Sequence, residues 1–389
     1  MITLQYLEPG PHIVEITPRM AGDKLRAALD ILPVDILLLG WNLPDPLVEV
    51  CREETARRGV KLYRWQPLLT GDGVFRPWGE WQTRNLDGHP LMDPEAREEF
   101  TFVCPNHPEA RAAALDHLEA VSDPGIYDGI FFDRIRFISP TASLVEVLAC
   151  FCPHCERTAA DEGLDLDKVR AYLRKAPMLS LFHAVLEPGS ITPFTRFLDF
   201  RQKVITRFVS EAAKRVRALG LEIGLDLFTT SLMRLVGQDL DSLPLLADWT
   251  KLMIYTHAFG PATLPYELAQ LTDWLSAEIP FSSDGPDGEP VDITGDPTLI
   301  SYTMLGYVAK MESVYREYGR ARQLAPSGTT LLAGIEMVEI PGVCQLTPDE
   351  IVHDLNVLND LNADGLAISW DLWQIPLERL ELVREIWGR

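Results

Sequence analysis

The stretch Tyr127–Phe137 (YDGIFFDRIRF) places charged side chains directly after a short apolar run. An Asp-Gly turn signal precedes three apolar residues, and a run of this kind is typical of a strand buried on both faces. A buried carboxylate is costly unless it is paired or lies at a polar opening. We therefore expect Asp133 at the carboxyl end of a buried strand, either in a functional site or in a structural ion pair with Arg136.

Polar and aromatic residues end the other apolar runs of the chain in the same way. Aromatic faces stack on the C–H surfaces of sugars, and carboxylates and amides hydrogen-bond to hydroxyl groups, so the combination indicates a carbohydrate site. A single Trp at such a position is as often packed in the core. The expected substrate-binding residues are Arg19, Trp41, Asn42, Trp65, Arg136, Asp226, Tyr255, His257, Trp370 and Asp371.

Asp133 and Glu336 form the candidate catalytic pair, because Glu336 ends the apolar run TLLAGIE as Asp133 ends its own. Glycoside hydrolysis requires two carboxyl groups, of which one donates a proton and the other attacks or activates water. Capping of a loop by Glu336 or by Glu339 is the alternative. Asp226, Glu339 and Asp371 are the substitutes if either member of the pair is structural.

Strand-like and helix-like segments alternate along the chain, and eight such pairs predict an α/β fold, the (β/α)8 TIM barrel. In such barrels the active site lies at the carboxyl ends of the strands, and strands four and seven face each other. A doubly wound sheet is disfavoured because no glycine-rich phosphate fingerprint follows the first strand. The expected strands are His12–Thr17, Asp35–Trp41, Val60–Trp65, a strand around Ile130, Glu222–Phe228, Lys251–Tyr255, Thr330–Glu336 and Leu366–Trp370.

The 389 residues are expected to form one barrel domain, because α/β barrels routinely exceed the length of an average domain. Long segments with little periodicity interrupt the alternation, and loops of this length are usually functional or disordered. The expected insertions follow strands three, four and six, at about 66–106, 139–193 and 280–297.

The net charge of −22 limits the partners of the protein. Nucleic acid and anionic membranes require a basic face, so neither is expected. A small-molecule or oligosaccharide substrate that is neutral or cationic is compatible with this charge. The chain has no apolar run long enough to cross a bilayer and no signal-peptide pattern, which favours a cytoplasmic location. The oligomeric state stays open, and a homo-oligomer is possible.

The segment 150–155 (CFCPHC) is a dense cluster of thiols, in a chain whose expected compartment disfavours disulfides. Structural zinc takes four tetrahedral ligands, and the fourth cysteine is expected from the preceding βα connection. His107 and His154 are alternative ligands, and a reduced buried cluster is the alternative to a metal. The expected ligands of a structural zinc are Cys104, Cys150, Cys152 and Cys155.

The segments DGIFFDRIRF, FVCPNHP, CFCPHC, DWTKLMIY and LLAGIE together resemble a group of bacterial glycoside-hydrolase-like barrel proteins, many of unassigned activity. A glutamate on strand seven and Trp370 on strand eight are also similar to the retaining clan-A glycosidases. This resemblance implies Glu336 as nucleophile and Asp133 as general acid/base. The zinc-containing β-galactosidases of that clan have a similar arrangement of cysteines, which implies zinc here.

The chain departs from the clan on strand four, where the clan has an Asn-Glu pair and this sequence has Phe132-Asp133. Asp133 is therefore also a candidate nucleophile, as in barrels resembling α-galactosidases, or a binding residue. The leading hypothesis is a glycosidase. The alternative is a non-catalytic carbohydrate-binding barrel, which needs no acid/base carboxylates. A metal-dependent hydrolase is disfavoured because the sequence has no H-x-H or H-E-x-x-H spacing.

Overall fold

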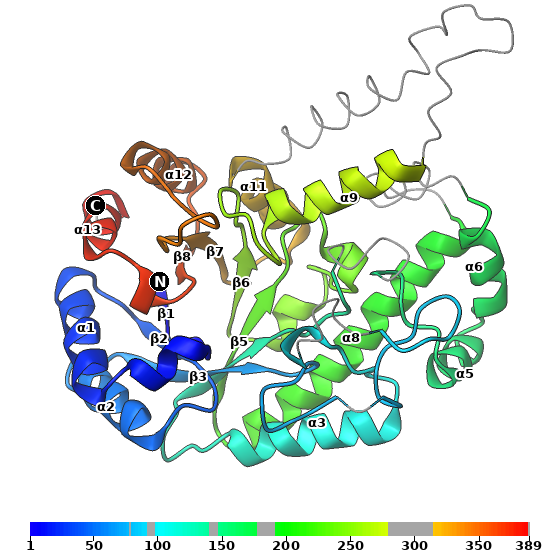
Figure 1. Ribbon diagram of the computed structural model, residues 1–389, viewed down its shortest axis with the longest axis horizontal. Coiled ribbons are helices and arrows are strands. Elements are labelled where there is room, and N and C mark those ends of the chain that lie inside the picture. The colour runs from blue at the N-terminus through cyan, green and yellow to red at the C-terminus, as the bar shows by residue number, and fades with distance from the viewer. Residues whose placement is uncertain (78, 92–97, 140–146, 177–190, 279–313, 388–389) are drawn as a thin grey trace, which may run out of the picture.

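Eight parallel strands form a closed barrel in the order of the sequence (Figure 1). The structure, a computed structural model, describes residues 1–77, 79–91, 98–139, 147–176, 191–278 and 314–387. The (β/α)8 fold is therefore confirmed. The strands are β1 (Ile2–Tyr6), β2 (Ile36–Leu39), β3 (Lys61–Pro67), β4 (Gly129–Asp133), β5 (Glu222–Leu227), β6 (Trp249–Met253), β7 (Leu331–Glu336) and β8 (Gly365–Ser369).

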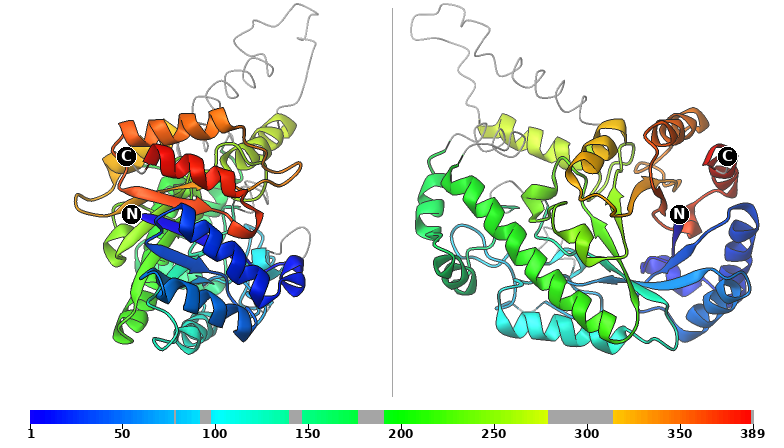
Figure 2. Two further views of the ribbon diagram at one scale, coloured as in Figure 1. Left: turned by 90° about the vertical axis from the view of Figure 1, so that its left-hand side faces the viewer. Right: turned by 180° about the vertical axis from the view of Figure 1, so that it is seen from behind.

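Helices surround the barrel, and the first and last strands, β1 and β8, pair with each other to close it (Figures 1 and 2). None of the described helices is both long and apolar enough to cross a bilayer. The α-helices are α1 (Pro18–Ile31), α2 (Asp45–Ala56), α3 (Pro108–Val121), α5 (Pro153–Asp161), α6 (Leu166–Leu173), α8 (Pro193–Ala218), α9 (Leu264–Glu278), α11 (Val314–Leu324), α12 (Pro348–Asp360) and α13 (Leu377–Trp387). Short 3₁₀ helices are η1 (Pro11–Glu15), η2 (Glu98–Phe100), η4 (Met233–Val236), η5 (Leu243–Leu246) and η7 (Leu372–Gln374).

The connections that follow β3, β4 and β6 hold loops and extra helices, as the sequence predicted. After β4, for example, α5 and α6 come before α8, which packs against β5. Parts of the first two expected insertions, and the whole of the third at 280–297, lie outside the described residues.

The predicted first strand, His12–Thr17, is wrong. Pro11–Glu15 forms the 3₁₀ helix η1, and the first strand is Ile2–Tyr6. Proline lacks the N–H that a strand needs for its ladder, which favours the turn. Thr17 is the N-cap of α1 rather than the end of a strand, and Arg19 consequently lies exposed on that helix, away from the barrel interior.

Aromatic side chains fill the interior of the barrel below its carboxyl end. The rings of Phe131 and Trp249 stack with centroids 5.2 Å apart, and Tyr63 contacts the same Trp. Glycine is required beside these rings. A Cβ at Gly129 would lie 2.5 Å from the ring of Tyr63, and one at Gly224 would lie 2.3 Å from that of Trp249. Small and large residues on neighbouring strands thus complement each other, which positions β4 and its terminal carboxylate.

We predict that Gly129→Ala lowers the free energy of unfolding by about 1–3 kcal/mol, because the added methyl group overpacks the barrel. Urea denaturation measures the change. Gly79→Ala is the matched control, since no heavy atom lies within 4 Å of a Cβ at that exposed position. Equal stability of the two variants would contradict the packing argument.

Candidate functional site

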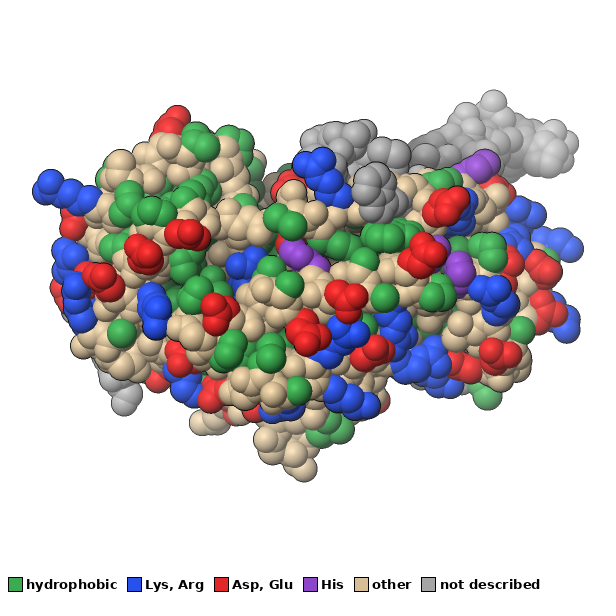
Figure 3. Space-filling model, turned by 90° about the horizontal axis from the view of Figure 1, so that it is seen from below, with side chains coloured by type: hydrophobic (Ala, Val, Ile, Leu, Met, Phe, Trp, Pro, Cys, Tyr) green, Lys and Arg blue, Asp and Glu red, His purple; other side chains and the backbone are tan. Residues whose placement is uncertain are grey.

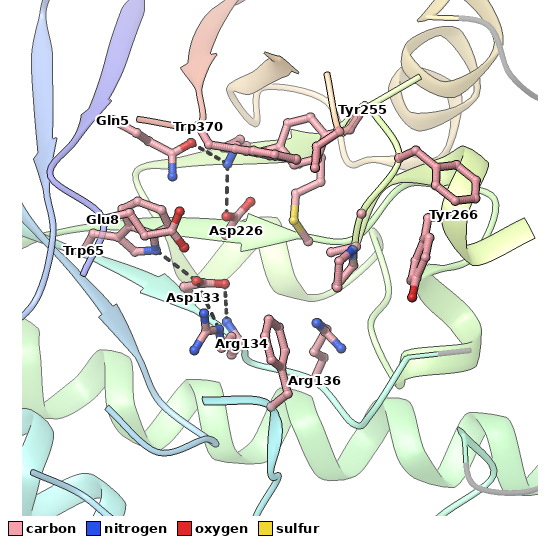
Figure 4. A pocket seen from close by; sticks show the side chains of 18 residues that line it. Gln5, Glu8, Trp65, Asp133, Arg134, Arg136, Asp226, Tyr255, Tyr266 and Trp370 are labelled. Carbon is pink, nitrogen blue, oxygen red and sulfur yellow. Dashed lines mark hydrogen bonds and ion pairs between the residues drawn. The ribbon is translucent and has the colours of Figure 1, made fainter. Parts of the chain in front are cut away.

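A cavity of about 410 Å³ opens at the carboxyl end of the barrel (Figure 4). It lies where barrels of this type place their active sites. The cavity brings together part of the predicted set from several strands and the loops that follow them. The sequence-predicted residues that line it are Trp65, Asp133, Arg136, Asp226, Tyr255 and Trp370.

Asp133, the last residue of β4, points into the cavity and is held by N–H donors. Its Oδ2 accepts a hydrogen bond from Trp65 Nε1 at 2.9 Å, and its Oδ1 accepts one from the backbone N–H of Arg134 at 2.5 Å. The chain turns sharply here, since Arg134 has a φ of 52°. The nearby guanidinium belongs to Arg134, with Nε 3.8 Å from Asp133 Oδ2, and not to Arg136 as the structural alternative had it.

Asp226 faces the barrel interior, an orientation that the sequence left undetermined. Its Oδ2 lies 3.0 Å from Nζ of Lys251, which also donates to Gln5 Oε1 at 2.9 Å. Burial raises the pKa of Asp226 to about 7, although the lysine opposes this shift. Asp226 and Lys251 therefore form a buried pair directly below the cavity.

Glu8 is a third carboxylic acid on the cavity wall, and it is not among the residues predicted from the sequence. It lies two residues after β1, and in Figure 4 its carboxyl group is beside Asp133. Burial raises the pKa of Glu8 to about 7, and the charge of Arg134 opposes this shift. Among the described residues no hydrogen-bond partner is recorded for its carboxyl group, so the group is available to a ligand.

Asp371 holds the backbone that presents Glu8. Its Oδ1 accepts hydrogen bonds from the N–H of Leu7 at 2.7 Å and of Trp373 at 3.0 Å, and His12 Nε2 lies 3.3 Å from its Oδ2. The side chain is buried and does not line the cavity. The contacts of Asp371 are therefore with the protein's own loops.

Aromatic rings form much of the cavity wall. Tyr255 and Trp370 meet edge to face, with centroids 5.7 Å apart, and Phe259 and Tyr266 do the same at 5.1 Å. Trp65 lies on the opposite side in Figure 4. Rings with accessible faces beside carboxyl groups can bind the apolar surface of a sugar while acids bind its hydroxyls.

Glu336 ends β7 as predicted, but its side chain does not line the cavity. Its Oε1 accepts hydrogen bonds from the backbone N–H groups of His257 at 2.6 Å and Ala258 at 2.9 Å. His257 lies outside the cavity lining too, and its Nε2 is 2.8 Å from Asp354. Burial opposes protonation, but Asp354 and Glu336 together raise the pKa of His257. Glu336 thus organises the loop after β6 by satisfying buried N–H groups.

Trp41 and Asn42 follow β2, in the loop after it, and do not line the cavity. Trp41 is buried, packs edge to face on Trp65 with centroids 5.4 Å apart, and lies under the Arg134 guanidinium. Asn42 donates to the backbone carbonyl of Asp72, in the loop after β3. These residues position the loops around the cavity rather than reach a ligand.

A buried polar network fixes that loop after β3. Asp72 accepts hydrogen bonds from Gln66 at 2.8 Å and from the N–H groups of Val74 and Phe75, and His117 Nε2 lies 2.6 Å from its Oδ2. Burial by itself would raise the pKa of Asp72, but the hydrogen bonds from His117 and Gln66 lower it to about 2. The loop is therefore tied to α3 by a charged group that has little exposure to water.

The missed residues of the cavity share one cause. Gln5 and Glu8 belong to β1 and its loop, which the analysis placed too late in the chain. The alternating run ITLQY, directly before the Pro-Gly-Pro sequence at residues 9–11, is a strand signal that locates them. Phe100 belongs to η2, Phe259 to the loop after β6 and Tyr266 to α9, and no local pattern assigns residues of such connections to a cavity.

Four buried cysteines form a possible metal site away from the cavity. The Sγ atoms of Cys104, Cys150, Cys152 and Cys155 all lie within 4.8 Å of one another, as the sequence predicted. The Sγ of Cys104 is 3.4 Å from that of Cys155 and 3.5 Å from that of Cys152. Tetrahedral zinc with Zn–S bonds of about 2.3 Å requires sulfur separations near these values. His107 and His154, the alternative ligands, instead contact each other, with ring centroids 4.3 Å apart.

The surroundings of the cluster suit thiolates. The Sγ of Cys150 accepts a hydrogen bond from the N–H of Arg84, and the Sγ of Cys155 accepts one from Asn106 Nδ2. N–H donors directed at sulfur stabilise its charged form, which is the form that binds metals. The cluster also joins the connection after β3 to that after β4, so an ion would link two long loops.

Solved structures with the same fold include several glycoside hydrolases. The glycoside hydrolase domain of PgaB (BpsB) from Bordetella bronchiseptica is similar with a TM-score of 0.58 and 13% identity, over 99% of this chain and 98% of that domain. Alpha-L-fucosidase isoenzyme 2 from Paenibacillus thiaminolyticus gives a TM-score of 0.51 and 12% identity, over 100% of this chain and 48% of the fucosidase.

A β-galactosidase from the Antarctic haloarchaeon Halorubrum lacusprofundi also gives a TM-score of 0.51 and 12% identity, over 97% of this chain and 55% of the enzyme. No protein-family model matches the chain, and no curated protein matches it in sequence. At these identities the likeness concerns the fold. The chain therefore has the TIM-barrel fold of glycoside hydrolase domains, which confirms the expected resemblance at that level.

We predict that Asp72→Asn lowers the stability at pH 7 by about 2 kcal/mol, the value of a pKa shift from 3.8 to about 2. Because the folded-state pKa is lowered, this contribution is present above about pH 4 and is lost as the pH falls toward 2. Urea unfolding at several pH values measures it. Asp161→Asn, on the exposed end of α5, is the control. If the difference in unfolding free energy between the wild type and Asp72→Asn does not become smaller in acid, the assignment is wrong.

Proposed function

We propose that the protein is a glycoside hydrolase that acts at the carboxyl end of its barrel. The observation that carries this proposal is the convergence of Asp133 and Glu8 on a cavity walled by aromatic rings. Two carboxyl groups across a cleft that binds sugar are the machinery of glycosidic bond cleavage. The shared fold of glycoside hydrolase domains supports the same conclusion.

Asp133 acts in this proposal as the nucleophile or as the base that activates water. Its two oxygens accept hydrogen bonds from Trp65 and from the backbone of Arg134, with a guanidinium group nearby. These contacts hold both carboxylate oxygens in place inside the cavity, and both roles require a carboxylate in a fixed position. The acid/base role that the clan-A resemblance implied for Asp133 is less compatible with these contacts.

Glu8 is the proposed general acid. A proton donor must be neutral before it acts, and the pKa of Glu8, raised by burial to about 7, keeps it protonated at mildly acidic pH. Asp226 has a pKa raised as far, but its carboxyl group is paired with Lys251 at 3.0 Å. The unpaired Glu8 is therefore better placed to donate, with Asp226 as a substrate-binding or positioning group.

Glu336 and the other predicted residues act indirectly in this proposal. Glu336 positions the loop after β6, and Asp371 positions the loop that carries Glu8. Trp65, Tyr255 and Trp370 stack on the sugar. A non-catalytic carbohydrate-binding barrel would retain the aromatic contacts and need neither carboxyl role, so turnover separates the two functions.

We predict that Asp133→Asn and Glu8→Gln each lower kcat by at least about a hundredfold on an aryl glycoside that the wild type hydrolyses, with folding intact. Initial rates over a panel of aryl glycosides identify that substrate first. Glu15→Gln, on the exposed face of η1, is the matched control for Glu8 and keeps wild-type turnover. Near wild-type rates in Glu8→Gln would transfer the acid role to Asp226, the other cavity acid with a raised pKa, and no turnover by the wild type would favour the binding barrel.

The pH dependence follows from the raised pKa of Glu8. Because the acid works in its protonated form, kcat/KM is expected to fall as the pH rises through about 7. Glu8→Gln should lose this limb of the profile, while Glu15→Gln retains it. A wild-type kcat/KM that keeps rising above pH 8 is incompatible with Glu8 as the general acid.

We further propose that the four cysteines hold a structural zinc ion. The separations of the sulfur atoms and the N–H donors around them fit a closed Cys₄ site, which leaves no coordination position for a substrate. The ion would stabilise the two long connections beside the cavity and take no part in the reaction.

We predict about one equivalent of zinc in the purified protein by elemental analysis. Cys152→Ser should lose most of the metal and lower the melting temperature more than it lowers kcat at a temperature where the variant is folded, because structural zinc contributes folding energy. Cys51→Ser, at a buried thiol outside the cluster, is the control and should retain the metal. Less than about a tenth of an equivalent in the wild type would reject the zinc site.

A further inference from the structure

Arg136 is a buried cation on the wall of the cavity with few of its donors in use. It is 5% exposed, and its guanidinium lies between the rings of Phe102 and Phe228, at 4.9 and 5.0 Å from their centroids. Nη1 donates to the backbone carbonyl of Phe137 at 3.1 Å. A guanidinium has five N–H donors, and this is the one hydrogen bond recorded for Arg136 among the described residues.

Other buried arginines of the protein show what a purely structural role looks like. Arg201, also packed against aromatic rings, donates from both terminal nitrogens to backbone carbonyls of Val147 and Leu235. Arg379 donates to three backbone carbonyls and forms an ion pair with Glu339 at 3.0 Å. Arg136 differs from both, because it lines the cavity and donates from only one of its nitrogens within the described part of the chain.

No carboxylate among the described residues lies within ion-pair distance of Arg136. Burial lowers the pKa of Arg136 to about 10, and the more distant charges of Glu267, Asp133 and Asp226 oppose the shift, so the group stays charged at neutral pH. A buried charge without a partner is costly. In a binding cavity this cost is offset when a ligand supplies the opposite charge.

The other charges of the cavity are compensated in pairs. Lys251 is paired with Asp226 at 3.0 Å, and Arg134 lies 3.8 Å from Asp133. Glu8 is largely neutral below pH 7 because of its raised pKa. Among the described residues, Arg136 is therefore the cation of the cavity wall without an ion-pair partner. In Figure 4 the guanidinium of Arg136 is directed toward the cavity, with no dashed line to another drawn residue.

We propose that Arg136 binds an anionic substituent of the sugar substrate, such as the carboxylate of a uronic acid or a sulfate ester. The planar guanidinium can donate two parallel hydrogen bonds to either group, and the aromatic wall binds the ring that carries it. This inference deepens the proposed function and rests on its carbohydrate ligand. It names the substrate class as acidic glycosides and makes Arg136 a specificity-determining residue.

Binding can test this assignment without turnover. The probes are the methyl glycosides of glucuronic and galacturonic acid, their neutral counterparts methyl glucoside and methyl galactoside, and methyl galactoside 6-sulfate, titrated into the full-length protein by calorimetry. At least one acidic probe is expected to bind about tenfold or more tightly than its neutral counterpart, since hydrogen bonds to charged groups contribute more than neutral ones. The uronide and sulfate arms distinguish the two anions.

Arg136→Gln should remove the preference for the acidic probe and leave the affinity for the neutral one within about twofold. Arg136→Lys should retain part of the preference, because it keeps the charge and loses the paired donors. Arg52→Gln, on the exposed face of α2, is the matched control and keeps the full preference. The affinities of the wild type for acidic and neutral probes test the inference without any variant. The test therefore still works if Arg136→Gln does not fold.

Wild-type protein without a preference for any acidic probe, including protein that binds none of the probes, would overturn the inference. A preference that persists in Arg136→Gln would overturn it as well. Failure of the proposed function looks different. If the protein prefers acidic sugars but hydrolyses no glycoside, the proposed activity fails and the anion site at Arg136 stands. If it hydrolyses only neutral glycosides and shows no preference for acidic ones, the proposed activity stands and the anion site fails.

Discussion

A buried ammonium group below the cavity constrains the whole barrel. Lys251 has no exposure to water, and removing an ion from water costs several kcal/mol unless partners replace the hydration. Its Nζ contacts Asp226 on β5 and Gln5 on β1, and Gln5 Oε1 in turn accepts a hydrogen bond from Ser369 on β8. Side chains of four strands are thus held at one level. The cavity forms directly above this level, where the strands end and the loops begin.

The residues at the strand ends divide into two groups according to what their polar atoms contact. Asp133 and Asp226 point into the cavity, whereas Glu336, Asp371 and Asn42 hydrogen-bond to the backbone of neighbouring loops. The second group does not line the cavity, yet it sets where the first group and Glu8 lie. A buried backbone N–H group without a hydrogen-bond acceptor destabilises the fold. Short acidic and amide side chains at the strand ends supply such acceptors to the loops around the cavity. The four clustered cysteines, outside the cavity, likewise bring together two long connections, the one after β3 and the one after β4.

The charge of the molecule and the charge of its cavity are different properties. Figure 3 shows acidic and basic side chains interspersed over one face of a protein whose net charge is −22. Inside the cavity, three cationic groups (Arg134, Arg136 and Lys251) lie beside three acidic groups, two of which have pKa values raised to about 7. The sequence favoured neutral or cationic ligands because an average over the chain is dominated by its surface. A cavity binds according to the few groups that line it, and water screens the distant surface charges.

The sequence by itself determined the barrel and most of its strands, because apolar runs of strand length alternate with amphipathic helices over the whole chain. It also determined which cysteines meet, since their spacing and the order of the barrel connections leave few arrangements. It placed Asp133 at a strand end correctly. The first strand was mistaken because η1 has apolar residues between Pro11 and Ile16 that mimic a strand, and Glu8 was lost with it.

Only the tertiary structure decided which strand-end residues face a ligand. Glu336 and Asp133 end equivalent apolar runs, and the sequence treats them alike. The difference lies in the neighbouring loop. The backbone N–H groups of His257 and Ala258, in the loop after β6, donate to Glu336, whereas the donors recorded to Asp133 in the described part of the chain are Trp65 and the adjoining Arg134. Likewise, local sequence paired Asp133 with Arg136, whereas the left-handed backbone at Arg134 turns that neighbour toward the carboxylate and leaves Arg136 to the cavity. Such choices depend on contacts between segments far apart in the chain, which no local pattern encodes.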